Sequence, residues 1–141
     1  MHHHGILGID WGSSKVGVAV ADAETRLAMG ITTLKNDDHL VEQLRRLIEE
    51  YEVTVAVIGI PSRVNREEVV YGGERLGEVL ERQLQLKVVY HNEMYTTKMA
   101  RANLVEQGVR NLDRHDDREA ARLILQSWLD APNGYAILQT V

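Results

Sequence analysis

GILGIDWGSSKVGVAVAD, residues 5–22, is the stretch that decides the fold. Two apolar runs, residues 6–10 and 16–21, flank a short segment whose glycine and serines favour a turn. This pattern predicts a β-hairpin. A third strand is expected over residues 28–34, after a polar break, so the chain is predicted to begin with three strands.

Helices and strands then alternate. Residues 40–51 and 69–84 carry apolar side chains at helical spacing, and strand character follows each of these segments. The strand over residues 53–60 is a nearly continuous β-branched run, which indicates burial on both faces of a sheet. A shorter strand is expected over residues 87–90.

The last third of the chain is predicted to be helical. Residues 96–107 end at Gly108, a common helix stop, and a strong apolar stripe over residues 120–129 precedes Pro132. The predicted order is therefore βββαβαβαα. It indicates an α/β fold in which a mixed five-stranded central sheet is flanked by helices.

The composition fits one domain. The chain has 141 residues, 44% of them hydrophobic, which is enough for one core and too few residues for two ordinary domains. We interpret residues 1–4, which hold three consecutive histidines, as an expression tag and residues 5–141 as a single domain. No apolar run reaches the length of a membrane span and no secretion signal is visible, so a cytoplasmic location without membrane contact is expected. The lack of cysteine excludes disulfides, thiolate zinc sites and thiol nucleophiles.

The net charge of −5 argues against a protein that coats nucleic acid, because such affinity comes mainly from lysine and arginine. Much of the acid falls in two predicted helices with solvent-facing sides. The basic side chains that fall in or beside predicted strand-end loops allow a local basic rim, formed by Lys15, Arg63, Arg66, Lys98, Arg101, Arg110, Arg114 and Arg118.

Two carboxylates follow predicted strands directly. Asp10 ends an apolar run in a strand expected to be central, where an unpaired charge would cost several kcal/mol. It therefore either meets a cation or caps the turn over residues 11–14. Glu93 follows the strand over residues 87–90, at the end where parallel strands bind ligands. Its alternative role is that of a solvated acid near a helix N-terminus.

Asp117 is the most informative acid. It precedes Ala120 and Ala121 by three and four residues, and so is predicted to face the sheet from the last helix. Asp116, about 100° further round the helix, suits the N-cap, with Glu119 completing a capping-box-like pattern. The alternative is that both aspartates serve only as caps.

Three acids from distant parts of the sequence would converge if the first and last parallel strands end side by side and the final helix packs across them. Hard cations such as Mg²⁺ or Mn²⁺ take oxygen ligands and are commonly held by a few carboxylates plus substrate phosphate. Two such ions suit an in-line phosphoryl displacement by water. Asp10, Glu93 and Asp117 are therefore the candidate site.

Four motifs resemble the YqgF/RuvX family. They are ILGIDWGSSKVGVAV at residues 6–20, VIGIP at 57–61, NEMYTT at 92–97 and DREAARLILQ at 117–126, and they span nearly the whole chain. Members of that family have an RNase H-like fold and are described as Holliday junction resolvases and as nucleases that process pre-16S ribosomal RNA. The resemblance implies a nuclease that hydrolyses phosphodiester bonds in RNA or DNA with Mg²⁺ or Mn²⁺.

The resemblance also implies roles for particular residues. Asp10, Glu93 and Asp117 match the catalytic, metal-binding acids of the family. Lys15 matches a basic position after the first turn. The full set expected to bind nucleic acid is Lys15, Arg63, Thr96, Thr97, Lys98 and Arg114.

The chain departs from the family pattern near the expected substrate groove. Asn92 and Met94 stand where the family usually has aspartate and arginine, and residues 63–66 read RVNR in place of an Asn-Met-x-Gly loop. The loop before Asp117, usually rich in lysine, keeps only Arg110, Arg114 and His115. The three acids are unchanged, so these departures bear on substrate preference and predict weak nucleic-acid affinity.

Three further side chains each allow two interpretations. His91 shares a strand face with Glu93 and either assists the site or is an ordinary histidine, which we favour. His115 either assists proton transfer or is a solvated loop residue, which is again favoured. Trp11 either stacks on a base or covers the edge of the core.

Two rival functions stay open at this point. Residues 8–14, GIDWGSS, also resemble the first phosphate loop of actin-like and sugar-kinase ATPases, but those enzymes need two domains and this chain has room for one. The other rival is a protein that binds nucleic acid or a ribosome-assembly partner without catalysis, which the presence of all three acids disfavours. A monomer and a homodimer are both compatible with the sequence, and resolving a symmetric junction would require a two-fold dimer.

Overall fold

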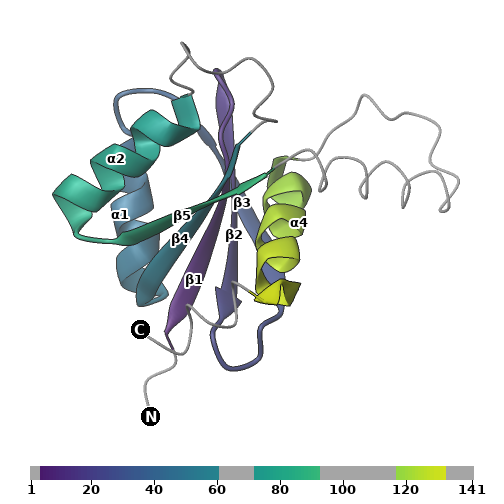
Figure 1. Ribbon diagram of the computed structural model, residues 1–141. Helices are drawn as coiled ribbons and strands as arrows, with labels where there is room; N and C mark the ends of the chain where they lie inside the picture. The colour runs from purple at the N-terminus through teal and green to yellow at the C-terminus, as the bar shows by residue number, and fades with distance from the viewer. Residues whose placement is uncertain (1–3, 61–71, 93–116, 133–141) are drawn as a thin grey trace, which may run out of the picture.

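The computed structural model describes residues 4–60, 72–92 and 117–132, and its centre is a mixed five-stranded sheet (Figure 1). The spatial order is β3-β2-β1-β4-β5. The first three strands pair antiparallel, whereas β4 pairs parallel with both β1 and β5. The predicted α/β class and mixed sheet are confirmed. The strands are β1 Gly5–Asp10, β2 Lys15–Asp22, β3 Ala28–Lys35, β4 Val53–Ile60 and β5 Lys87–Asn92.

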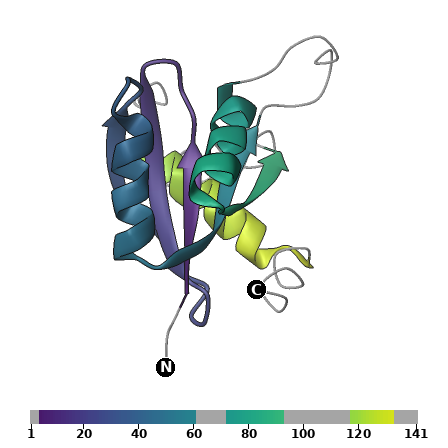
Figure 2. The same ribbon diagram turned by 90° about the vertical axis from the view of Figure 1, so that its left-hand side faces the viewer.

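Helices cover both faces of the sheet (Figure 2). Helices α1, Leu40–Glu50, and α2, Gly72–Leu84, pack on one face, and α4, Asp117–Asp130, packs on the other. None of the described helices is long and apolar enough to span a membrane. The helix expected over residues 96–107 lies outside the described residues.

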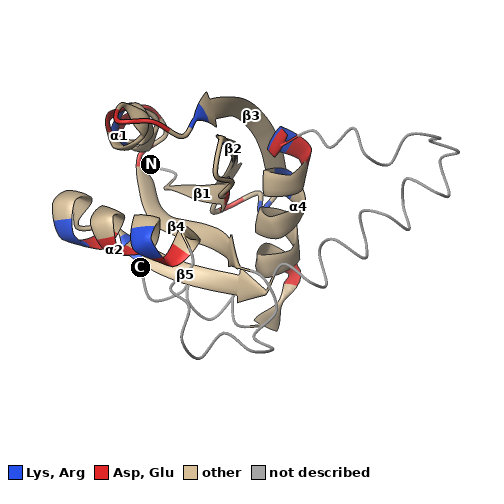
Figure 3. Cartoon of the chain, turned by 90° about the horizontal axis from the view of Figure 1, so that it is seen from above, with Lys and Arg blue, Asp and Glu red and all other residues tan. Residues whose placement is uncertain are grey.

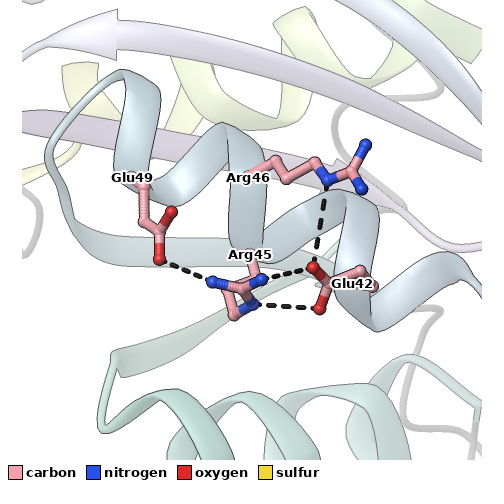
Figure 4. A network of polar contacts seen from close by, with 4 residues as sticks. All are labelled: Glu42, Arg45, Arg46 and Glu49. Atoms are coloured by element: carbon pink, nitrogen blue, oxygen red, sulfur yellow. Dashed lines mark hydrogen bonds and ion pairs between the residues drawn. The ribbon is translucent and has the colours of Figure 1, made fainter.

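The solvent side of α1 carries a local ion-pair network (Figure 4). Arg45 donates to Glu42 and, through Nη1, to Glu49 Oε1 at 2.7 Å, while Arg46 Nε lies 3.9 Å from Glu42. The hydrogen bond from Arg45 lowers the pKa of Glu42. Arginines on the same helix thus balance much of the negative charge of the acidic residues predicted for this segment.

Strand β1 separates two apolar cores by simple alternation. Leu7 and Ile9 point into the core beneath α1 and α2, whereas Ile6 points into the core beneath α4. Gly8 also faces α4, because a Cβ placed on it would lie 2.6 Å from the Cβ of Leu125. By the same alternation, the side chain of Asp10 is on the face of the sheet that α4 covers.

Strand β4 lies between β1 and β5, so the first strand and the last parallel strand are not adjacent. From the sequence, the convergence of the three acids was conditional on these two strands ending side by side, and β4 lies between them. Strand β4 is an inner strand next to the central strand β1, and seven of its eight residues are buried. The carboxyl ends of β1 and β5 are consequently separated by about 9.6 Å, two strand spacings.

Candidate active site

Asp10 ends the central strand β1 and is half-buried. Its Cα register partner on β2 is Gly17. A glycine at this position presents no side chain toward α4, so the sheet beside Asp10 is open to a close approach from above.

Asp117, the first residue of α4, lies directly over Gly17. A Cβ placed on Gly17 would lie 2.0 Å from the Asp117 carbonyl oxygen and 3.0 Å from the Asp117 Cβ. The start of α4 therefore rests directly on the backbone of the residue paired with Asp10. Two half-buried aspartates from opposite ends of the chain are brought to neighbouring positions on one face of the sheet.

Two more glycines let α4 lie close to the sheet along its length. A Cβ on Gly30 of β3 would meet the Arg118 carbonyl oxygen at 2.9 Å, and one on Gly8 would meet the Ala121 carbonyl oxygen at 3.0 Å. Seen from above, the N-terminal end of α4 lies beside β2 and β3 (Figure 3). Backbone contacts on three strands thus hold α4 against the sheet, and the contact with Gly17 lies at Asp117 itself.

Hydrogen bonds hold the other end of α4. The Gln126 side chain accepts from the Ala28 N–H at 2.9 Å and donates to the Arg26 carbonyl oxygen at 3.1 Å. The Arg26 guanidinium in turn donates to the Leu129 carbonyl oxygen. The helix is anchored at both ends to the antiparallel half of the sheet, so its N-terminal carboxylate is held by the fold rather than by a loop.

His91 lies on the same face, toward the far edge of the sheet. Its Cα partner on β4 is Gly59, and its Nε2 lies 2.9 Å from the Ser127 Oγ of α4. Burial lowers the pKa of His91, which favours its neutral form. This partner supports the interpretation of His91 as a structural histidine that joins β5 to α4.

Trp11 packs against the protein core, which was one of its two interpretations from the sequence. A Cβ on Gly72, at the start of α2, would lie 2.1 Å from an atom of the indole ring, and Trp11 packs against the core beneath α1 and α2. The ring covers the edge of the core, on the face opposite to α4.

Lys15 begins β2 two residues before Gly17, so it projects on the α4 face with Asp10 and Asp117. It is exposed, and its Cα partner on β3 is Lys35, which is exposed as well. The sequence does not single out Lys35, because its pairing with Lys15 depends on the β2–β3 register, which local sequence patterns do not specify.

Comparison with known proteins places this arrangement in a family. Residues 4–131 match the family described as RuvX, Holliday junction resolvase. The chain belongs to the RuvX family. A relative from Lactococcus lactis subsp. cremoris is 37% identical over 134 residues, which cover 89% of this chain and 94% of the relative. One from Listeria monocytogenes is 35% identical over 136 residues, covering 91% and 99%. Both carry the name "Putative pre-16S rRNA nuclease".

A solved structure supports the fold of this RuvX-family chain. T. thermophilus RuvC in complex with Holliday junction substrate superposes with a TM-score of 0.59 at 16% identity, covering 94% of this chain and 98% of RuvC. The RNase H-like fold expected from the motifs is confirmed, and with the family match it makes the protein a nuclease, a hydrolase of phosphodiester bonds. The rival ATPase assignment is not supported.

The other predicted site residues of this RuvX-family chain lie outside the described residues: Glu93, Arg63, Thr96, Thr97, Lys98 and Arg114. The N-cap role of Asp116 and the loop residue His115 lie there too. Within the described ranges no group of three or more His, Cys, Asp or Glu side chains is placed to hold a metal ion. What the described ranges contribute is the pair Asp10 and Asp117.

Proposed function

We propose that this RuvX-family nuclease hydrolyses nucleic acid with a divalent cation, Mg²⁺ or Mn²⁺, bound by Asp10 and Asp117, with Glu93 as third ligand and all three acids catalytic. The observation that carries the proposal is the contact of the Asp117 backbone with Gly17, the register partner of Asp10. A helix start packed this tightly onto β2, beside the central strand β1, gives the two carboxylates a fixed separation.

The donor set fits such a cation. Two carboxylates at neighbouring, half-buried positions repel each other, and a cation between them removes that repulsion. Their oxygens are the hard ligands that Mg²⁺ and Mn²⁺ prefer, and sites of this kind leave room for water and substrate phosphate. The chemistry such ions supply when bound is activation of a water nucleophile and stabilisation of the leaving oxygen.

The chain's own side chains orient the substrate in this proposal. Lys15 lies exposed on the face that carries both aspartates and binds the phosphate backbone. Asp10 is held by the sheet and Asp117 by the anchored helix, so neither needs to move when substrate arrives. The residues proposed to complete the nucleic-acid contacts are Arg63, Thr96, Thr97, Lys98 and Arg114.

We further propose pre-16S ribosomal RNA as the principal substrate, with a cytoplasmic site of action. Relatives 35–37% identical over most of their length carry that substrate in their names. The likeness to the junction-bound RuvC is at 16% identity and supports the fold only. A four-way DNA junction is therefore the comparison substrate in the test.

The test is cleavage of three labelled substrates, a pre-16S rRNA fragment, single-stranded DNA and a four-way junction, with Mg²⁺, Mn²⁺ or EDTA. The wild-type protein is compared with Asp10→Asn, Asp117→Asn and a control, Glu78→Gln, which changes an exposed acid of α2. Loss of residues that merely support metal ligands costs 10–100-fold in activity, so each aspartate variant should lose at least about 10²-fold while the control keeps its rate. Equal cleavage by wild type and both aspartate variants would mean a contaminant and would overturn the proposal.

A further inference from the structure

Two lysines stand opposite each other at one end of the β2–β3 ladder. Lys15, the first residue of β2, and Lys35, the last residue of β3, are Cα register partners, and both are exposed. Directly opposed residues have Cβ atoms about 4.5–5.5 Å apart and point to the same face. Like charges in this position destabilise a strand pair.

The two lysines make no direct contact with an acidic side chain among the described residues. Neither lysine forms an ion pair within the part of the chain that the structure describes. The nearest acid after Lys35 in the sequence is Asp37, whose Oδ1 accepts a hydrogen bond from the His39 N–H at 2.9 Å, on the turn into α1. This end of the ladder therefore carries two adjacent positive charges.

The lysines project on the same side of the sheet as the two aspartates. The next pair along the ladder, Val16 and Leu34, packs into the core beneath α1 and α2. The pair after that includes Gly17, whose backbone touches Asp117 on the opposite face. Since side chains alternate along a strand, Lys15 and Lys35 belong to the α4 face.

Lys15 also lies close to Asp10. Lys15 is two residues from the register partner of Asp10, which makes the two diagonal neighbours, with Cα atoms roughly 7–8 Å apart. A lysine side chain spans most of that distance. One strand of nucleic acid can therefore place one phosphate at the carboxylates and a neighbouring phosphate between the two ammonium groups.

We infer that Lys15 and Lys35 together bind one backbone phosphate of the nucleic-acid substrate, beside the site of cleavage. The inference rests on the proposed function and extends it to Lys35, a residue that the family motifs did not indicate. Two ammonium groups recognise phosphate by charge and read no base, so this contact adds affinity and fixes register without adding sequence preference. It also gives a chain of net charge −5 two adjacent positive charges for a polyanion at one place on its surface.

The test is the binding of a fluorescein-labelled 20-nucleotide single-stranded RNA in Ca²⁺, with the probe checked for integrity after each titration. The dissociation constant is measured from 50 to 200 mM salt for the wild type, Lys35→Gln and Lys87→Gln. Lys87 is an exposed lysine at the start of β5, at the other end of the sheet, and serves as the matched control. A melting curve of each protein without RNA shows whether it is folded.

Lys35→Gln should weaken binding about fivefold at low salt, the effect of one lysine at an anionic surface. The slope of log K against log salt should become shallower by about 0.7, the value for one single-strand phosphate contact. Its melting temperature should equal or exceed that of the wild type, because a like-charge pair has been removed. If Lys35→Gln and Lys87→Gln give the same affinity and slope, the inference is overturned while the proposed function stands. If the wild type does not bind RNA, both the inference and the proposed function are overturned.

Discussion

Replacing Gly17 by alanine should uncouple the two aspartates without touching either of them. The new methyl group would lie 2.0 Å from the Asp117 carbonyl oxygen and 2.5 Å from its carbonyl carbon. Both are backbone atoms of a helix that is anchored at its far end by Gln126, so no flexible side chain can move aside. The start of α4 must shift.

The size of the shift follows from the contact distances. Ordinary van der Waals contact begins at 3.4 Å, so the Asp117 carbonyl oxygen has to retreat by about 1.4 Å. A misplacement of about 1 Å in a catalytic arrangement costs about 10²-fold in rate. Overpacking of this kind typically also costs about 1–3 kcal/mol of stability. We therefore expect Gly17→Ala to remain folded, with a cleavage rate at least about 100-fold below that of the wild type.

The assay compares single-turnover cleavage of a pre-16S rRNA fragment with urea unfolding for the wild type, Gly17→Ala and Gly8→Ala. In Gly8→Ala the new methyl group would meet Leu125 Cβ at 2.6 Å and the Ala121 carbonyl oxygen at 3.0 Å, about two turns and one turn from Asp117 on the same helix. Its stability loss should match that of Gly17→Ala, and its loss of rate should be much smaller. Wild-type cleavage by Gly17→Ala, or an equal loss of rate in both variants, would refute the coupling of Asp10 and Asp117 through Gly17.

Three smaller predictions concern the framework around the site. Ser127→Ala removes the partner of His91 and should lower the free energy of unfolding by about 1 kcal/mol in urea, whereas no change would mean that the hydrogen bond does not join β5 to α4. Gln126→Ala removes two bonds between α4 and the β2–β3 turn and should cost about 1–3 kcal/mol, with a melting temperature lowered accordingly; an unchanged melting temperature would contradict that anchor. Burial raises the pKa of Tyr90, so the unfolded chain releases this proton first and stability should fall as pH rises above about 10. Urea midpoints from pH 8 to 11 should show this extra loss in the wild type and not in Tyr90→Phe, and parallel curves would exclude it.

Local patterns were sufficient for most of the described fold. The strand over residues 53–60 was predicted with the bounds it has, because the length of the run and its β-branched residues favour a strand over a helix. Asp10 was placed correctly in a central strand by the apolar residues before it. Asp117 was placed on the sheet side of its helix by its spacing from Ala120 and Ala121, and the contact with Gly17 shows it there.

Long-range pairing could not be predicted in the same way. Nothing in the residues of β1 or β5 indicates that β4 lies between them, because strand order depends on how crossovers pack. Two details of the site have the same origin. The role of Gly17 and the pairing of Lys15 with Lys35 both depend on register, and register is fixed by turns and packing rather than by composition.

Mn²⁺ binding provides the most direct measurement of whether Asp10 and Asp117 form one metal site. Free Mn²⁺ would be followed by electron paramagnetic resonance during titration of the wild type, Asp10→Asn, Asp117→Asn and the double variant, with the fold of each checked by its melting curve. Residues that hold the same ion act as a unit, so each single variant should weaken Mn²⁺ binding by a similar large factor and the double variant should lose little more. Wild-type Mn²⁺ affinity in either single variant would contradict the account.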